Sequence, residues 1–165
     1  MPPTHNPFSV SLPVSLLLPP EDDVTSLLPG PNSVSAHVAE RLSAVPAVPA
    51  ALIVLRLSQG DGRPAADALA AATSVVARSL RGDDWLGRSG PDEFAVLLGG
   101  SAADAEVAAA RLTAAIAALD VPGLGACAGV TDLEAGSTAA ETLQRAARAL
   151  HAACAGDVVR HRSTS

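Results

Sequence analysis

Continuous apolar runs along the chain alternate with stretches in which apolar residues recur every three or four positions. The run 50–57 has strand length and β-branched residues at its centre, as in a strand buried on both faces. Two shorter runs flank the turn residues Ser-Gly-Pro within 85–98 and predict a β-hairpin. Helical spacing predicts helices over 34–42, 64–81, 102–119 and 138–154.

These elements also carry predictions about their ends. Asn32 is a plausible cap for the first helix, and Gly82 a left-handed stop after the second. A small-residue strand is expected at 125–131, and Val158 with Val159 reads as a short final strand. The third helix should pack through Val107, Leu112, Ile116 and Leu119.

Strands that alternate with helices predict an α/β domain with a mixed central sheet and flanking helices. The hairpin would supply an antiparallel strand pair, and the helical crossovers would supply parallel pairs.

Composition narrows the class of protein. The 165 residues are 48% apolar, enough for one globular domain. Acidic residues number 17 against 11 basic ones, so no basic field exists for a nucleic-acid polymer. No apolar run reaches membrane-spanning length and the start lacks the positive region of a signal peptide, so a cytoplasmic protein without a membrane span is expected. In that compartment Cys127 and Cys154 are expected to be reduced core thiols.

Three segments are predicted along the chain. Residues 1–21 are rich in proline and read as a flexible or extended tail, with a packed arm as the alternative. The apolar run 14–18 in this tail could dock on a partner. Residues 22–160 form the domain, and 161–165 a disordered C-terminus.

Several polar residues are candidates for chemistry. Asp92 and Glu93 are adjacent at the predicted hairpin, so they point to opposite faces and at most one enters a given pocket. Arg81 suits a helix C-terminus, and Asp67 near a helix start complements the helix dipole. Asp84 has no such structural explanation.

The stretch Arg81-Gly-Asp-Asp84, followed by Arg88-Ser89 and Gly90-Pro-Asp-Glu-Phe94, resembles the signature of GGDEF domains. These are diguanylate cyclases, which make cyclic di-GMP from two GTP, and the resemblance extends over about 22–160. It implies a nucleotidyl-cyclase-like fold with the hairpin at the motif. It also implies that Arg81 and Asp84 form an inhibitory site, where Arg grips a phosphate and Asp meets a guanine edge of cyclic di-GMP.

The resemblance assigns further residues and shows departures. Asp67 matches a guanine-recognising Asp, and Gly90 lies at the turn that approaches the nucleotide, so both are possible nucleotide-binding remnants. Arg56 stands where the family has the first magnesium-binding Asp, and its guanidinium should abolish the metal site. Arg56 then either pairs with Asp92 or Glu93, or extends its head into solvent.

Other departures remove groups that hold the substrate. Pro91 replaces the second Gly of the signature, an insert that carries Lys and Asn is missing, and Cys154 replaces a phosphate-binding Lys. The chain contains no lysine at all.

Three functions remain open at this point. The first is a catalytically inactive, degenerate GGDEF domain, with Asp92 and Glu93 as motif remnants, that acts as a cyclic di-GMP receptor through Arg81 and Asp84. The second is a protein–protein interaction module without nucleotide binding, with a homodimer or another protein as partner. The third is an active cyclase, the only one of the three that would need Mg²⁺ as a cofactor.

Overall fold

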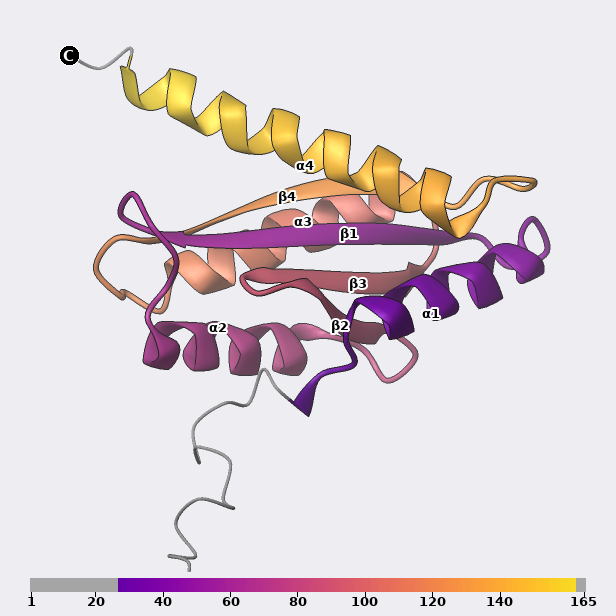
Figure 1. Ribbon diagram of the computed structural model, residues 1–165, viewed down its shortest axis with the longest axis horizontal. Helices are drawn as coiled ribbons and strands as arrows, with labels where there is room; N and C mark the ends of the chain where they lie inside the picture. The colour runs from indigo at the N-terminus through magenta and orange to yellow at the C-terminus, as the bar shows by residue number, and fades with distance from the viewer. Residues whose placement is uncertain (1–26, 163–165) are drawn as a thin grey trace, which may run out of the picture.

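The computed structural model describes residues 27–162, with side chains as far as residue 156. The predictions for 1–21 and for 163–165 lie outside this range, whereas His161 and Arg162 fall in the last helix. Within the range, four strands form one sheet in the order β2-β3-β1-β4, and helices pack around it (Figure 1). The elements in chain order are α1 (Pro31–Ala44), β1 (Ala50–Gln59), α2 (Ala66–Ser79), β2 (Trp85–Gly90), β3 (Glu93–Gly99), α3 (Ala102–Ala117), β4 (Leu124–Asp132) and α4 (Ala139–Arg162).

The α/β class with a central sheet and flanking helices is confirmed, but each strand pairing in the described range is antiparallel. The crossovers through α2 and α3 do join strands that run in the same direction. However, β3 lies between β1 and β2, and β1 lies between β3 and β4. The expected parallel pairs are therefore absent from the described range, because each crossover skips one strand.

Helices cover both faces of the sheet. On one face, α2 and α3 pack against a cluster built around Ile53, Leu55, Phe94 and Val96. On the other, α1 and α4 pack against Leu52, Val54 and Leu97 with their neighbours. The central strands β1 and β3 are thus buried on both sides, which explains their continuous apolar sequences.

Two predicted helix ends are wrong. Helix α1 begins one residue after Gly30, with Pro31 in its first turn, so Asn32 lies inside the helix and is not its cap. Proline fits that position because its missing N–H would have had no partner there. Helix α2 ends at Ser79, and Gly82 lies in the following turn without a left-handed φ.

Helix α3 packs through a stripe that was only partly predicted. Leu112 and Ile116 are buried, and alanines complete the stripe, whereas Val107 is 70% exposed. Small alanine side chains let α3 lie close to the sheet. The buried stripe runs through Ala108, the residue after Val107, and Val107 itself faces outward.

Helix α1 is fastened to the edge strand β2. The rings of His37 and Trp85 meet edge to face, with centroids 4.3 Å apart. Gly87 makes room for the indole, because a Cβ there would lie 2.7 Å from Trp85 Cζ3. The Arg88 N–H donates to the Pro29 carbonyl at 2.7 Å.

The segment predicted as a final strand is helical. Val158 and Val159 lie within α4, which continues to Arg162. A two-residue apolar pair specifies a strand weakly, and the alanine-rich sequence before it has high helix propensity.

Helix α4 is joined to β4 by a disulfide between Cys127 and Cys154, so the expectation of reduced thiols is wrong for this structure. Their Cα atoms lie 5.4 Å apart, within the range that a disulfide spans. The fold thus brings together two cysteines that the sequence separates by 27 positions.

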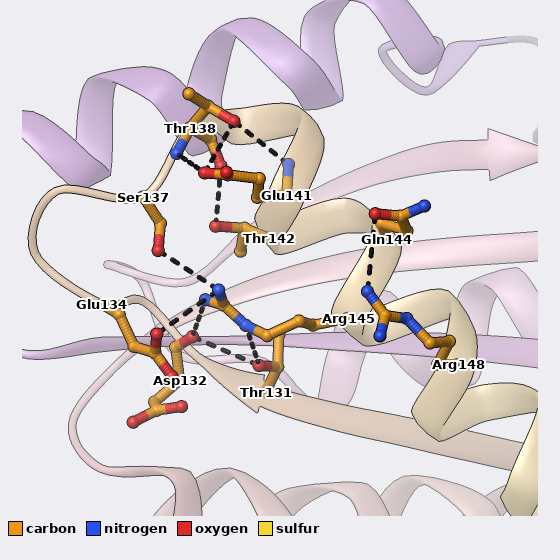
Figure 2. Close-up of polar contacts among 10 residues, drawn as sticks. All are labelled: Thr131, Asp132, Glu134, Ser137, Thr138, Glu141, Thr142, Gln144, Arg145 and Arg148. Carbon is orange, nitrogen blue, oxygen red and sulfur yellow. Dashed lines mark hydrogen bonds and ion pairs between the residues drawn. The ribbon is translucent and has the colours of Figure 1, made fainter.

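Arg145 holds the loop between β4 and α4 (Figure 2). Its guanidinium donates to Thr131 Oγ1 at 3.4 Å, to Ser137 Oγ at 3.2 Å and to the Asp132 carbonyl at 3.3 Å. It also forms an ion pair with Glu134 at 3.4 Å. We assign Arg145 a structural role, because its Nε, Nη1 and Nη2 each donate to a residue of this loop or of β4.

No helix within residues 27–162 combines the length and the apolar character needed to cross a membrane.

Candidate functional site

The predicted hairpin is present and places its acidic residues at the end of β1. Pro91 and Asp92 form the turn between β2 and β3. The Asp92 carbonyl accepts a hydrogen bond from the Leu57 N–H at 2.9 Å, which ties the turn to β1. Glu93 begins β3 and lies directly opposite Arg56 in the strand register.

Arg56 and Glu93 form an ion pair. Arg56 Nε and Nη2 both donate to Glu93 Oε1, at 2.9 Å and 2.5 Å. The two side chains are 40% and 21% exposed, so the carboxylate is the more buried partner. Of the alternatives for Arg56, pairing with Glu93 is the one found.

This ion pair forms the polar end of a pocket of about 290 Å³. The pocket lies between the sheet and the two helices on that face, α1 and α4, and its other walls are mainly apolar. Its lining residues are Pro31, Val34, Val54, Arg56, Ser89, Glu93, Leu143, Ala147 and Leu150.

The residues at this pocket do not fit a magnesium ion. Magnesium requires several oxygen ligands in near-octahedral geometry. Here the nearest carboxylate, Glu93, is already bonded to a permanent cation. Within residues 27–162 no cluster of three or more His, Cys, Asp or Glu side chains is placed to hold a metal ion.

Arg81 and Asp84 form a compact turn after α2. Asp84 Oδ2 accepts the Arg81 N–H at 2.7 Å, and the Asp84 N–H donates to the Arg81 carbonyl at 3.1 Å. The Asp83 carbonyl next to it accepts from Arg41 on α1 at 3.1 Å. The Asp84 carboxylate, rather than Gly82, therefore closes this turn.

The turn borders a second pocket, of about 350 Å³, at the start of α3. Its charged residues are Arg81, Asp84, Asp104 and Arg111, and Val107 adds an exposed apolar surface. Arg111 also donates to the Ser79 carbonyl at 3.3 Å, which holds it beside the end of α2.

Asp104 is the acidic residue in the first turn of α3. Its pKa lies below the ordinary value of 3.8, first because the Ser101 backbone N–H bonds to it, and then because the Ser101 hydroxyl does. Arg81 lowers the pKa further through its positive charge. Arg81 and Asp104 both line this pocket, which therefore carries charges of both signs.

The two pockets separate the predicted residues into groups. Arg81 and Asp84 line one pocket and Glu93 lines the other, while Asp67 lines neither. Asp67 is exposed on the first turn of α2, where its Oδ1 accepts the Ala68 N–H at 2.9 Å. Gly90 ends β2, and a Cβ there would make only an ordinary 3.5 Å contact with Glu93.

Sequence analysis did not identify Arg111. It lies on a different helix from the Arg81 turn, and its only sequence signal is an exposed positive charge in an alanine-rich helix. The packing of α3 beside α2 brings it to the pocket.

Comparisons with known proteins found similar structures but no match by family model or among curated proteins. No protein-family model matches the chain, and no curated protein is similar enough to count as a match. Solved structures of diguanylate cyclases and GGDEF domains do match.

Three structures illustrate the likeness. The chain matches diguanylate cyclase SiaD of Pseudomonas aeruginosa, solved with its activator SiaC, with a TM-score of 0.70 and 24% identity over 82% of this chain. It spans 58% of that SiaD chain. A sensory box/GGDEF family protein of Caulobacter crescentus CB15 matches with a TM-score of 0.66 and 27% identity, over 78% of this chain and 94% of that one. The GGDEF domain of DgcB from Caulobacter crescentus, solved with c-di-GMP, matches with a TM-score of 0.69 and 17% identity, over 78% of this chain and 86% of that one.

Proposed function

We propose that this chain, which has the fold of GGDEF domains, is a catalytically inactive member of that group and binds cyclic di-GMP at the pocket beside the Arg81 turn. The observation that carries the proposal is that two arginines, Arg81 and Arg111, and the carboxylate of Asp84 line one pocket of about 350 Å³.

The chemistry of this pocket suits a cyclic dinucleotide. Each phosphate carries a negative charge, which a guanidinium binds in a charge-assisted, two-pronged contact. A carboxylate accepts the N–H groups on a guanine edge, and its several lone pairs allow Asp84 to do so while it holds the turn. Val107 offers an apolar surface for a base at the same pocket.

The other pocket supports the lack of catalysis. Phosphoryl transfer of this kind depends on metal ions and cations that neutralise the developing charge. Here Glu93 forms an ion pair with Arg56, and the sequence has no lysine to hold phosphates. Asp92 and Glu93 therefore carry no catalytic step in this proposal.

Calorimetric titration with cyclic di-GMP tests the proposal. We expect saturable binding by the wild type and binding at least roughly tenfold weaker for Arg81→Ala, because a charged hydrogen bond contributes about 1.5 to 3 kcal/mol. Arg111→Ala should have a similar effect. Arg78→Ala is the matched control, since Arg78 is exposed in the last turn of α2 but does not line the pocket.

A parallel titration and a product assay with GTP and Mg²⁺ separate the alternatives. Cyclic di-GMP formation that Asp92→Ala abolishes would show an active cyclase and contradict the proposed inactivity. An absence of heat with both nucleotides would instead make the chain an interaction module with this fold. Equal affinity in the wild type and Arg81→Ala would show that a bound nucleotide lies elsewhere.

A further inference from the structure

Strand β4 has a free edge within the described structure. It pairs with β1 along its whole length, and no other strand between residues 27 and 162 lies on its far side. Residues 124–128 are only half-buried, although none of them is polar. They are Leu124, Gly125, Ala126, Cys127 and Ala128. An apolar strand edge with unpaired backbone groups is a template for another strand.

A groove runs along this edge on the side of α3. It has a volume of about 320 Å³, and small side chains form most of its walls. Ala126, Ala128 and Val130 come from β4, while Ala109 and Ala110 come from α3. Walls of this kind leave room for larger apolar side chains from an added strand.

We propose that residues 8–18 of this chain add to β4 as a fifth strand and fill the groove. Their sequence, Phe-Ser-Val-Ser-Leu-Pro-Val-Ser-Leu-Leu-Leu, alternates apolar residues with serine or proline as far as Leu16, and Leu17 is the one apolar residue at an odd-numbered position. In an extended strand the even-numbered residues from Phe8 to Leu18 share one face, and that face is entirely apolar. The groove receives this face, and the serines point away from it.

The proline in this segment agrees with an outermost position. Backbone N–H groups also alternate in direction along a strand. If the even-numbered residues pair with β4, Pro13 faces outward, where no N–H is needed. An interior strand would not tolerate the same residue.

The described chain starts within reach of this edge. Leu28 packs against the cluster on the α2 and α3 face, which is the face of the groove. Pro29 bonds to Arg88 on β2, and in the plane of the sheet a fifth strand lies four strand spacings from β2, roughly 19 Å. The nine residues 19–27 span up to about 30 Å when extended, so the tail can reach the edge of its own domain.

Hydrogen–deuterium exchange of the full chain, followed by mass spectrometry, tests the proposal. We expect peptides from 8–18 and from β4 to exchange at least about tenfold more slowly in the wild type than in Leu12→Asp, which places a charge in the groove. Ser11→Asp is the matched control and should keep the protection. Ala110→Arg, a change at an exposed position of α3, should fill the groove and release the tail in the same way.

The remaining outcomes also decide the matter. Protection of β4 that persists in Leu12→Asp and Ala110→Arg would overturn the proposal, because another segment or a second β4 would then cover the edge. Fast exchange of 8–18 in the wild type would overturn it as well. Protection that falls on dilution would support it, with the tail donated by a second copy.

Discussion

Arg56 and Glu93 are cross-strand neighbours of opposite charge at the end of the two central strands. Such pairs contribute about 0.2 to 1 kcal/mol, and the exposure of Arg56 keeps this pair within that range. Both donated hydrogen bonds go to one carboxylate oxygen, Oε1, so the geometry falls short of a two-oxygen fork. The pair therefore orients Glu93 more than it stabilises the fold.

A double-mutant cycle measures this contribution. Arg56→Met and Glu93→Gln, alone and combined, should show a coupling energy of about 0.5 to 1 kcal/mol in urea unfolding. A control cycle with Arg56→Met and Asp92→Asn should show almost none, because Arg56 bonds to Glu93 and Asp92 is held to β1 through its backbone carbonyl. Equal coupling in the two cycles would contradict the pairing.

At the scale of single residues, the sequence predicted which residues make polar contacts better than it predicted their partners. Arg56 was expected to meet Asp92 or Glu93, and only the register of β1 against β3 selects Glu93. Arg111 could not be predicted, because its approach to Arg81 depends on how two helices pack on the sheet. Such contacts between distant residues have no local sequence pattern.

Among the elements, β4 and α4 are in close contact at Gly129. A Cβ on Gly129 would lie 2.7 Å from Leu150 Cα and 2.8 Å from the Ala146 carbonyl oxygen. Both atoms belong to the helix backbone, so no side-chain rotation can relieve the contact. The glycine thus sets the distance between the strand and the helix.

Gly129→Ala should lower the free energy of unfolding by about 3 kcal/mol, since α4 must move away from the sheet. Gly125→Ala on the same strand is the control, because its Cβ would meet only Ser58 Oγ at 3.7 Å. Chemical denaturation of both variants checks the difference. Similar midpoints would mean that α4 shifts at little cost.

The elements themselves were largely predictable, while their ends were not. The apolar runs of β1 and β3 and the helical spacing of α2 and α3 gave the right type of structure in each case. Gly82 failed as a stop because the Asp84 side chain closes the turn after α2. The pair Val158 and Val159 failed because two residues carry too little periodicity to outweigh a continuing helix.

For the whole molecule, the strand order and the disulfide are the features that local sequence could not give. Strand order depends on which strand each crossover skips, and the disulfide depends on the packing of α4 over β4. The disulfide closes a loop across a sequence separation of 27 residues. Closing a loop of that length restricts the unfolded chain and stabilises the folded one.

Reduction of the disulfide should lower the free energy of unfolding by about 3.5 kcal/mol in the chain-entropy account. Denaturation with and without a thiol reductant measures the difference. The double variant Cys127→Ala and Cys154→Ala should have the same free energy of unfolding with and without the reductant. A wild type equally indifferent to reductant would return the two cysteines to the reduced state first expected for them.

Trp85 gives the molecule a built-in optical reporter. The chain has one tryptophan and no tyrosine, so its near-ultraviolet emission comes almost entirely from one indole. That indole lies where α1 meets the sheet, against the His37 ring and over Gly87. Detachment of α1 would therefore change the colour and intensity of the emitted light, while events confined to the distant β4 edge would leave both unaltered.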